Sequence, residues 1–194
     1  NCRVRGEMPE LYFCNDMKGY GWCFRKGLYL NIGLGREDSH GLSAHLEYFC
    51  DFLKQRGRIP QDIPDHFHGH AYLLHDHAAR KHVDNGMLLI GDAAGLAYPQ
   101  SGEGIRPAVE SGLLAADSIL EAGEDYSREQ LHSYSARLLE RFGAATAPVD
   151  IAPQFVHSFV GGALLKNKWF TRHVVLDRWF LHATQSSIHA GGNA

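Results

Sequence analysis

The feature that most constrains the fold of this chain is a short apolar run, Met87–Ile90, which lies between Gly86 and Gly91. The run lacks the alternation of a strand with one solvated face, and a strand that is apolar on both faces is typical of a buried parallel sheet. A glycine-rich segment follows it, and helical periodicity begins at Ile105. We therefore expect an α/β fold in which a strand, a loop and a helix follow one another.

The loop between this strand and this helix carries residues suited to a ligand. In open α/β sheets, ligands bind beyond the carboxyl ends of strands, often at a helix N-terminus. Asp92 is placed to accept hydrogen bonds from ligand hydroxyls, and Gly102 and Gly104 let the backbone come close because they have no Cβ. The N–H groups at the start of the Ile105 helix would stabilise negative charge. The alternative is a tight turn capped by Asp92, but the number of special backbone positions favours a ligand site.

The N-terminal part of the chain predicts an antiparallel meander. Pro9–Cys14, Tyr20–Phe24 and Leu28–Leu34 have strand patterns, with a turn at Lys26 and Gly27 between the last two. We expect one apolar face on this sheet. The residues expected on it are Tyr20, Trp22 and Phe24 from the second strand and Leu28, Leu30, Ile32 and Leu34 from the third. Two interpretations stay open for the aromatic residues, a lining of an apolar ligand cavity and ordinary core packing.

Three further segments have helical periodicity. Leu42–Arg56 ends at Gly57, the Ile105 helix ends at Gly123, and Ser127–Phe142 begins with a capping box of Ser127 and Gln130. The residues expected to face inward on the first helix are Leu42, Leu46, Phe49, Cys50 and Leu53. On the Ile105 helix they are Ile105, Val109, Leu113, Ala116 and Leu120, and on the last helix Leu131, Tyr134, Leu138 and Phe142. The apolar tail from Phe155 to Ala183 is also helical in pattern, and its aromatic stripe indicates core packing more than a membrane-facing patch. That stripe is Trp169, Phe170, Val174, Trp179 and Phe180.

The loop and the aromatic strand both resemble a known family. The loop sequence resembles the second FAD-binding motif of flavoprotein oxidoreductases, in the version closest to the geranylgeranyl reductase family. The residues that match are Gly91, Asp92, Ala93, Gly95, Pro99, Gly102, Glu103, Gly104 and Ile105, with Ser111, Gly112, Ala115 and Ala116 on the following helix. The resemblance implies that Asp92 holds the ribityl chain of FAD and that Gly102–Ile105 lies against the flavin and the pyrophosphate.

A second, independent resemblance lies in the aromatic strand. Tyr20, Trp22 and Phe24, followed by Gly27, are similar to the substrate-cavity motif of the same family. The family has proline where this chain has Arg25. The resemblance implies that the aromatic residues line an apolar substrate cavity.

The resemblance implies an FAD-dependent reductase of carbon–carbon double bonds in an isoprenoid or similar apolar substrate, with NAD(P)H or another electron donor. A flavin-dependent monooxygenase or halogenase, and a non-catalytic binding module derived from a flavoprotein, are the alternatives. No residue stands out as catalytic. The chain has no Gly-x-Gly-x-x-Gly fingerprint. We therefore expect the C-terminal half of a longer enzyme that is inactive by itself and binds FAD weakly or not at all.

We expect three segments. Residues 1–82 form an antiparallel-sheet substrate region with a helix, residues 83–125 the C-terminal piece of a Rossmann-like FAD domain, and residues 126–194 a helical region. The Met87–Ile90 strand would have an exposed parallel edge if its sheet partners lie in the missing half, and such an edge indicates a homodimer.

The net charge, the cysteines and the histidines exclude several classes of function. A net charge of −3 provides no positive electrostatic field that would attract the phosphates of a nucleic acid. The chain has four cysteines and no Cys-x-x-Cys pair, which indicates reduced thiols and a cytoplasmic protein, with peripheral membrane contact as a further expectation. Six of the 13 histidines fall between His66 and His82, but their spacing matches no familiar metal site, so we expect no metal.

Overall fold

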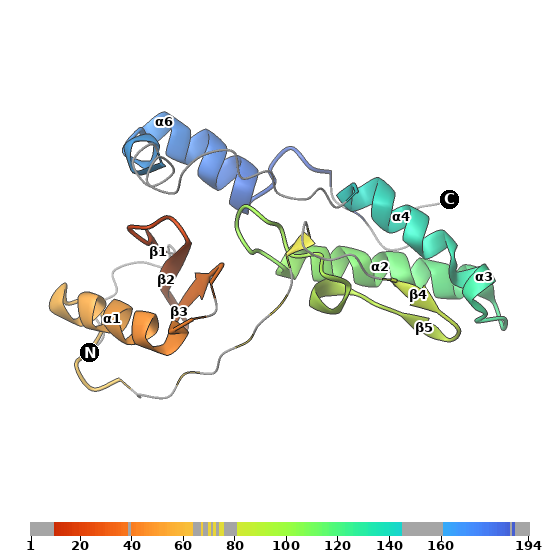
Figure 1. Ribbon diagram of the computed structural model, residues 1–194, viewed down its shortest axis with the longest axis horizontal. Helices are drawn as coiled ribbons and strands as arrows, with labels where there is room; N and C mark the ends of the chain where they lie inside the picture. Colours follow the sequence, from red (N-terminus) through yellow and green to blue (C-terminus); the bar gives the residue numbers. More distant parts are fainter. Residues whose placement is uncertain are drawn as a thin grey trace. The chain divides into compact units, whose positions relative to one another are not determined.

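The computed structural model describes residues 10–38, 40–63, 67, 70, 72, 74–75, 81–144, 161–186 and 188 (Figure 1). These residues form helices and small antiparallel sheets, which confirms a mixed α/β class. The chain divides into two compact units. Unit 1 comprises residues 1–71 and 151–167, and unit 2 comprises residues 72–150 and 168–194. The Rossmann-like character of residues 83–125 and the three-segment division stay predictions.

Unit 1 contains the expected meander. Strands β1 (Glu10–Phe13), β2 (Gly19–Lys26) and β3 (Tyr29–Arg36) form an antiparallel sheet in the order β1-β2-β3. The turn between β2 and β3 includes Gly27, whose φ of 59° lies in the left-handed region. The side chain of Arg25, which replaces the proline of the family motif, donates from Nε to the Gly27 carbonyl at 2.9 Å. Arg25 therefore supports the turn that ends β2.

The sheet has two apolar faces, so the expectation of one apolar face is wrong. Residues opposite each other in an antiparallel pair lie on the same face. Cys23 lies opposite Ile32 and Trp22 lies opposite Gly33. The aliphatic residues of β3 therefore share a face with Cys23, and the large aromatic residues of β2 lie on the other. Leu28 lies on neither face, because it is in the turn and is 93% exposed.

Helix α1 (Leu42–Gln55) covers the face that carries Cys23. The core of unit 1 consists of Cys23, Phe49, Cys50, Leu53 and Ile59, with Leu30, Ile32, Leu34 and Leu46 packed against it. The predicted helical stripe is therefore confirmed for Leu46, Phe49, Cys50 and Leu53, whereas Leu42 is partly buried and does not join this core. The opposite side of the sheet, which we call the aromatic face, consists of Phe13, Tyr20, Trp22 and Phe24, all partly buried and none in that core. Ordinary packing against α1 is thus excluded for these residues.

In unit 2, the structure has a hairpin where the sequence predicts that Met87–Ile90 forms a buried parallel strand. Strands β4 (Val83–Asp84) and β5 (Met87–Leu88) are antiparallel, and Asn85 and Gly86 form the turn between them. Asn-Gly is a strong signal for a two-residue hairpin turn. Met87 is 46% exposed and Ile90 is 44% exposed, so the run is not buried on both faces. Among the described residues, the one parallel pairing is a single bridge between Leu74 and Ala97.

The loop after β5 contains a short helical turn, η2 (Gly91–Ala94), and then leads to helix α2 (Ile105–Ala122). The position of α2 is as predicted, but its buried face is not. The expected inward residues Ile105, Val109 and Leu120 are 80%, 59% and 78% exposed, Ala116 is also exposed, and Leu113 is partly buried. The buried residues are Pro107, Glu110, Ser111, Ala115 and Ser118. Polar side chains occupy this face because each has a partner, as described below.

The predicted helix at 127–142 is divided into α3 (Arg128–Leu131) and α4 (Ser133–Phe142). Ser127 caps α3, because its hydroxyl oxygen accepts the N–H of Gln130 at 3.4 Å. The predicted inward residues Leu131, Tyr134 and Leu138 are buried in the core of unit 2. Val83, Ala94, Leu96 and Ala115 complete that core.

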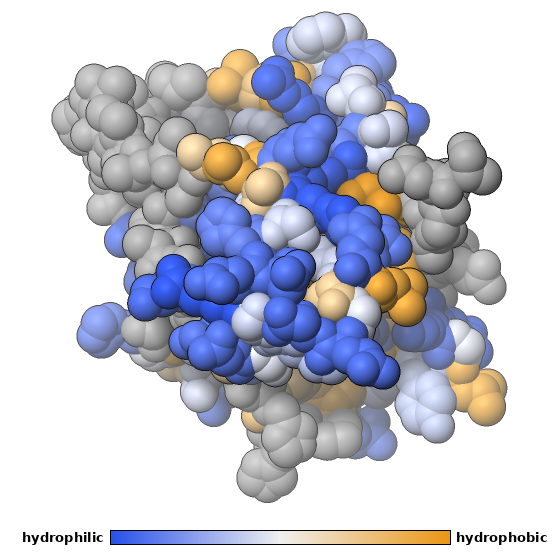
Figure 2. Space-filling model, turned by 90° about the vertical axis from the view of Figure 1, so that its right-hand side faces the viewer, coloured by the Kyte–Doolittle hydropathy of each residue, from blue (hydrophilic) through white to orange (hydrophobic). Residues whose placement is uncertain are grey.

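The C-terminal part is helical, as expected. Residues 161–165, α6 (Lys168–Phe170) and η3 (Thr171–Phe180), a wide helix of the π type, are its described helical segments. Trp169 is 66% exposed, and the rest of the predicted stripe is partly buried. None of the described helices is long and apolar enough to cross a membrane. The face in Figure 2 is mainly hydrophilic with separate hydrophobic spots.

The close contact between Gly21 of β2 and the Phe49 ring of α1 predicts that a larger residue at position 21 lowers the stability of the fold. A methyl group at Gly21 would lie 2.5–2.9 Å from three ring carbons of Phe49. We expect Gly21→Ala to lower the free energy of unfolding by about 1–3 kcal/mol, because the ring must move out of a packed core. Chemical denaturation measures this change.

Gly35→Ala is the matched control, since its methyl group would meet only Trp22 Cζ3 at 3.8 Å. Equal stability of the two variants would contradict the packing of Phe49 on β2.

Candidate functional site

The loop that carries the predicted cofactor residues is anchored at its start by α2 and α4. The Tyr134 hydroxyl donates to the Leu89 carbonyl at 2.7 Å, and burial raises the pKa of Tyr134 to about 12, so the phenol stays a donor. The Gly91 N–H donates to the Ser111 hydroxyl at 3.0 Å. A Cβ at Gly91 would lie 2.9 Å from the Ala108 Cβ, and its φ of 52° is one that side chains rarely adopt. Gly91 is therefore required for the loop to pack on α2.

The middle of the loop forms two tight turns. The Gly95 N–H donates to the Asp92 carbonyl at 3.0 Å, and the Leu96 N–H donates to the Gly91 carbonyl at 3.2 Å. Further along, the Gly102 N–H donates to the Tyr98 carbonyl at 2.7 Å. These turns reverse the chain, so that the beginning and the end of the motif lie next to each other.

The short distance between Asp92 and Gly104 shows that the beginning and the end of the motif are neighbours. A Cβ at Gly104 would lie 2.8 Å from Asp92 Oδ1. The Tyr72 hydroxyl donates to the Gly102 carbonyl at 2.8 Å, and burial together with the charges of Asp92 and Glu103 raises the pKa of this phenol. The structure therefore brings Asp92, Gly102, Glu103 and Gly104 into one group and adds Tyr72 to it.

The N-terminus of α2 differs from the sequence expectation. Glu103 Oε1 accepts the Arg106 N–H at 2.9 Å, and Pro107 has no N–H to offer. Two of the first three positions of α2 therefore present no N–H group to an anion. Glu103 Oε2 is buried and accepts no hydrogen bond from the residues that the structure describes.

A buried ion cluster fixes the other side of α2. Glu110 is 5% exposed, and its carboxylate accepts hydrogen bonds from Arg106 Nε at 2.9 Å and from Arg141 Nη2 at 2.5 Å. Burial raises the pKa of Glu110, but the hydrogen bonds from Arg141 and Arg106 outweigh it and hold the pKa below its ordinary value. The cluster joins α2 to α4.

Arg106 also binds the C-terminal segment of unit 2. Its guanidinium donates to the carbonyls of His182 at 3.2 Å and Gln185 at 2.9 Å. The ring of His182 stacks on Tyr98 with centroids 3.7 Å apart, and the Tyr98 hydroxyl donates to the Gln185 side chain at 2.9 Å. The loop of the motif is therefore held from two sides, by α2 and by residues 181–186.

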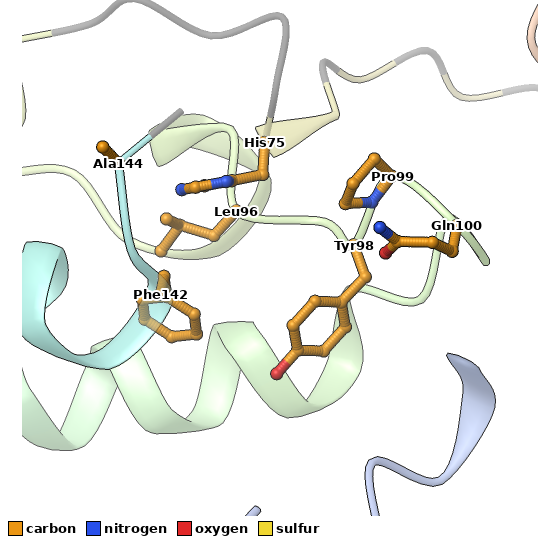
Figure 3. A pocket seen from close by; sticks show the side chains of 7 residues that line it. All are labelled: His75, Leu96, Tyr98, Pro99, Gln100, Phe142 and Ala144. Carbon is orange, nitrogen blue, oxygen red and sulfur yellow. The ribbon is translucent and has the colours of Figure 1, made fainter. Parts of the chain in front are cut away.

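A small pocket adjoins the loop (Figure 3). Its lining residues are His75, Leu96, Tyr98, Pro99, Gln100, Phe142 and Ala144, and its volume is about 230 Å³. Ligand pockets usually measure roughly 300–1,000 Å³. This pocket is therefore too small for a dinucleotide, and Pro99 is the one motif residue that lines it.

Other predicted residues are not among those that these contacts bring together. Tyr20, Trp22 and Phe24 belong to unit 1, and Ala93 and Ile105 are exposed. Among the described residues there is no cluster that could hold a metal. His66, His68 and His77 lie outside the described residues, and the described His82 makes a hydrogen bond to the Ala94 carbonyl at 3.2 Å.

Several residues that shape the site were missed by sequence reasoning. Arg106 and Glu110 have the i, i+4 spacing of a helical ion pair, which was an available signal. Tyr72, Arg141 and His182 are distant in sequence from the motif, and no local pattern identifies them.

The residues present fit the FAD contacts that the motif implies. The absence of a Cβ at Gly104 leaves the carboxylate of Asp92 room beside the backbone, and the turn at Gly102 brings the end of the loop to the same place. Carboxylate oxygens accept hydrogen bonds from sugar-like hydroxyls. The group therefore contains an acceptor of the type that a polyhydroxyl chain needs.

Comparison with known proteins gives one consistent class. The digeranylgeranylglycerophospholipid reductase of Methanocaldococcus jannaschii is 33% identical over 141 residues, which cover 69% of this chain and 35% of that protein. Digeranylgeranylglycerophospholipid reductase 1 of Methanosphaera stadtmanae is 32% identical over 160 residues, covering 79% of this chain and 39% of that protein. The digeranylgeranylglycerophospholipid reductase of Sulfolobus acidocaldarius is 30% identical over 141 residues, which cover 71% of this chain and 31% of that protein. No family model and no solved structure matches.

These relatives are reductases, and the chain spans about a third of the length of the curated relatives it matches. The chain belongs to the geranylgeranyl reductase family.

The ion cluster of α2 predicts a pH-dependent stability difference. At neutral pH, we expect Glu110→Gln to lower the free energy of unfolding by about 3–5 kcal/mol, because it leaves the two arginines without their buried partner. Since the pKa of Glu110 is lowered in the fold, its contribution is fully present above the ordinary value of 4.5 and is lost as pH falls below it. Denaturation of both proteins across this pH range measures the difference.

Glu140→Gln, at an exposed position of α4, is the control and should leave stability nearly unchanged. A difference between wild type and Glu110→Gln that stays constant from neutral pH down to about pH 3, which is below the ordinary pKa of 4.5, would contradict the assignment.

Proposed function

We propose that this chain contributes part of the FAD site and the substrate face of a reductase that saturates carbon–carbon double bonds in an isoprenoid lipid. The observation that carries the proposal is the approach of Asp92 to Gly104 in a loop whose sequence matches the flavoprotein motif. The names of the relatives, which contain digeranylgeranylglycerophospholipid, support an isoprenoid lipid as the substrate class.

In this proposal the residues of the chain have distinct tasks. Asp92 accepts hydrogen bonds from the ribityl hydroxyls, and the turn at Gly102 and Gly104 lets the backbone lie against the cofactor. Tyr72 fixes the Gly102 carbonyl, and Ser111 fixes the Gly91 N–H. FAD, when bound, supplies the two-electron redox chemistry, with NAD(P)H or another donor as the source of electrons.

The aromatic face supplies the apolar environment for the substrate. Phe13, Tyr20 and Trp22 form a row of rings, with centroids 6.0 Å apart for Phe13 with Tyr20 and for Tyr20 with Trp22, and Phe24 lies on the same face of the sheet. An isoprenoid chain gains dispersion contacts on such a surface and leaves water. Reduction adds a hydride to one carbon of the double bond and a proton to the other.

The protein of full natural length tests this function. Purified protein is expected to show a flavin absorption spectrum, and under anaerobic conditions with a reduced donor it should add one hydrogen molecule per double bond of digeranylgeranylglycerophospholipid, measured by mass spectrometry. Oxygen consumption with a hydroxylated or halogenated product would instead support a monooxygenase or halogenase. Absence of flavin from the folded protein would support a binding module.

A carboxylate variant tests the role of Asp92. We expect Asp92→Asn to weaken FAD binding about tenfold, because an amide replaces a charged acceptor of hydrogen bonds. Titration of the apoprotein with FAD measures the dissociation constant. Asp84→Asn, at an exposed carboxylate in the same unit, is the control, and equal affinities of the two variants would contradict the proposed role.

A further inference from the structure

We propose that the tip of the β2–β3 hairpin, Arg25–Tyr29, docks on the surface of an anionic phospholipid membrane. The inference rests on the proposed function, because a reductase of an isoprenoid phospholipid must reach a substrate that resides in a membrane. The proposed substrate contacts do not include this tip, since Leu28 and Tyr29 come after the motif of β2 and are not part of the aromatic face defined above.

The tip projects beyond the three-stranded part of the sheet. Strand β1 pairs with β2 from Tyr20 to Cys23, whereas the pairing of β2 with β3 continues to Lys26 and Tyr29. Within the described residues, the end of the hairpin is therefore a two-stranded ribbon. All residues from Arg25 to Tyr29 are exposed, so their side chains are accessible to an extended surface.

The tip presents two large apolar side chains to solvent. Leu28 is 93% exposed, the highest value among the large hydrophobic residues that the structure describes, and its neighbour Tyr29 is 80% exposed. Leucine gains from transfer out of water, and tyrosine is enriched where a membrane meets water because its ring is apolar and its hydroxyl is polar. The pair therefore suits the boundary between lipid headgroups and acyl chains.

The backbone holds these two side chains in place. Lys26 and Tyr29 are the last paired residues, so Gly27 and Leu28 form a two-residue turn. Gly27 has a φ of 59°, which glycine adopts readily, and its carbonyl accepts the Arg25 Nε–H at 2.9 Å. Because the turn is formed before contact, docking requires little ordering of the chain.

The charge beside the apolar pair indicates the kind of surface. Arg25 and Lys26 are exposed, the five tip residues include no carboxylate, and no carboxylate among the described residues forms an ion pair with either cation. By contrast, Arg36 and Arg58 of the same unit each pair with a carboxylate. Exposed cations next to an inserting side chain are attracted to anionic lipid headgroups. An anionic membrane therefore accounts for both the apolar and the cationic residues of the tip, whereas an apolar partner surface leaves the two charges without counter-ions.

The test uses the protein of full natural length and phospholipid vesicles. Vesicles of phosphatidylcholine with roughly a quarter phosphatidylglycerol provide the anionic surface, and pure phosphatidylcholine vesicles provide the neutral one. Sedimentation at low ionic strength measures the partition coefficient. The variants are Leu28→Ser/Tyr29→Ser, which removes the apolar pair, and Lys26→Gln, which removes one cation. Tyr48→Ser on α1 is the matched control, because Tyr48 is 73% exposed and lies outside the tip.

We expect the wild-type protein to bind anionic vesicles about tenfold more tightly than neutral ones, because of the two tip cations. Leu28→Ser/Tyr29→Ser should lower the partition coefficient on anionic vesicles about tenfold or more, Lys26→Gln about fivefold, and Tyr48→Ser less than about twofold. Thermal unfolding verifies that each variant is folded.

Three results would overturn the inference. They are wild-type protein that stays in the supernatant with anionic vesicles, equal binding to the two kinds of vesicle, and equal partition coefficients for Leu28→Ser/Tyr29→Ser and Tyr48→Ser.

The proposed function is tested separately, by reduction of digeranylgeranylglycerophospholipid dispersed in detergent, where no membrane is needed. Wild-type protein that reduces the dispersed lipid but binds no vesicle contradicts only the docking role of the tip. Wild-type protein that binds vesicles through the tip but reduces no lipid contradicts only the proposed function.

Discussion

Unit 2 depends on a carboxylate that has been removed from water. Glu110 is buried in α2, and removing a charge from water costs several kcal/mol unless partners replace the solvent. Arg106 and Arg141 replace it from α2 itself and from α4. Because Arg106 also binds the carbonyls of residues 181–186, one charge determines where three parts of the chain meet. The loop of the cofactor motif is packed against this assembly through Gly91 and Ser111.

Close backbone approaches define both functional regions. In unit 2, Gly91 rests on Ala108 and Gly104 leaves room for Asp92. In unit 1, Gly21 receives the Phe49 ring on the face toward α1, and Gly33 receives Trp22 on the aromatic face. The glycines of the loop and of the sheet thus have one task in common, which is to let a functional or packing group reach the main chain.

Sequence periodicity predicted the elements better than their buried faces. The apolar stripe on α1 was predictable because it buries aliphatic and aromatic side chains against a sheet. The face of α2 was not, because Glu110, Ser111 and Ser118 are buried through partners far away in the chain. The two faces of the unit 1 sheet follow from the pairing of Cys23 with Ile32, which no single strand reveals. The motif residues were predicted from their sequence, whereas Tyr72 and Arg141 reach the site only through tertiary structure.

The binding of residues 181–186 by Arg106 has a consequence for synthesis on the ribosome. The hydrogen bonds from Arg106 to the carbonyls of Leu181, His182, Gln185 and Ser186 span 75, 76, 79 and 80 residues. At about 5–20 residues per second, the acceptors emerge roughly 4–16 seconds after the arginine. During that interval Arg106 can pair with Glu110, four residues along the chain, but the carbonyls that it binds in the fold have not yet been made. The segment that completes the packing of the loop is therefore made at least 75 residues after the arginine that binds it.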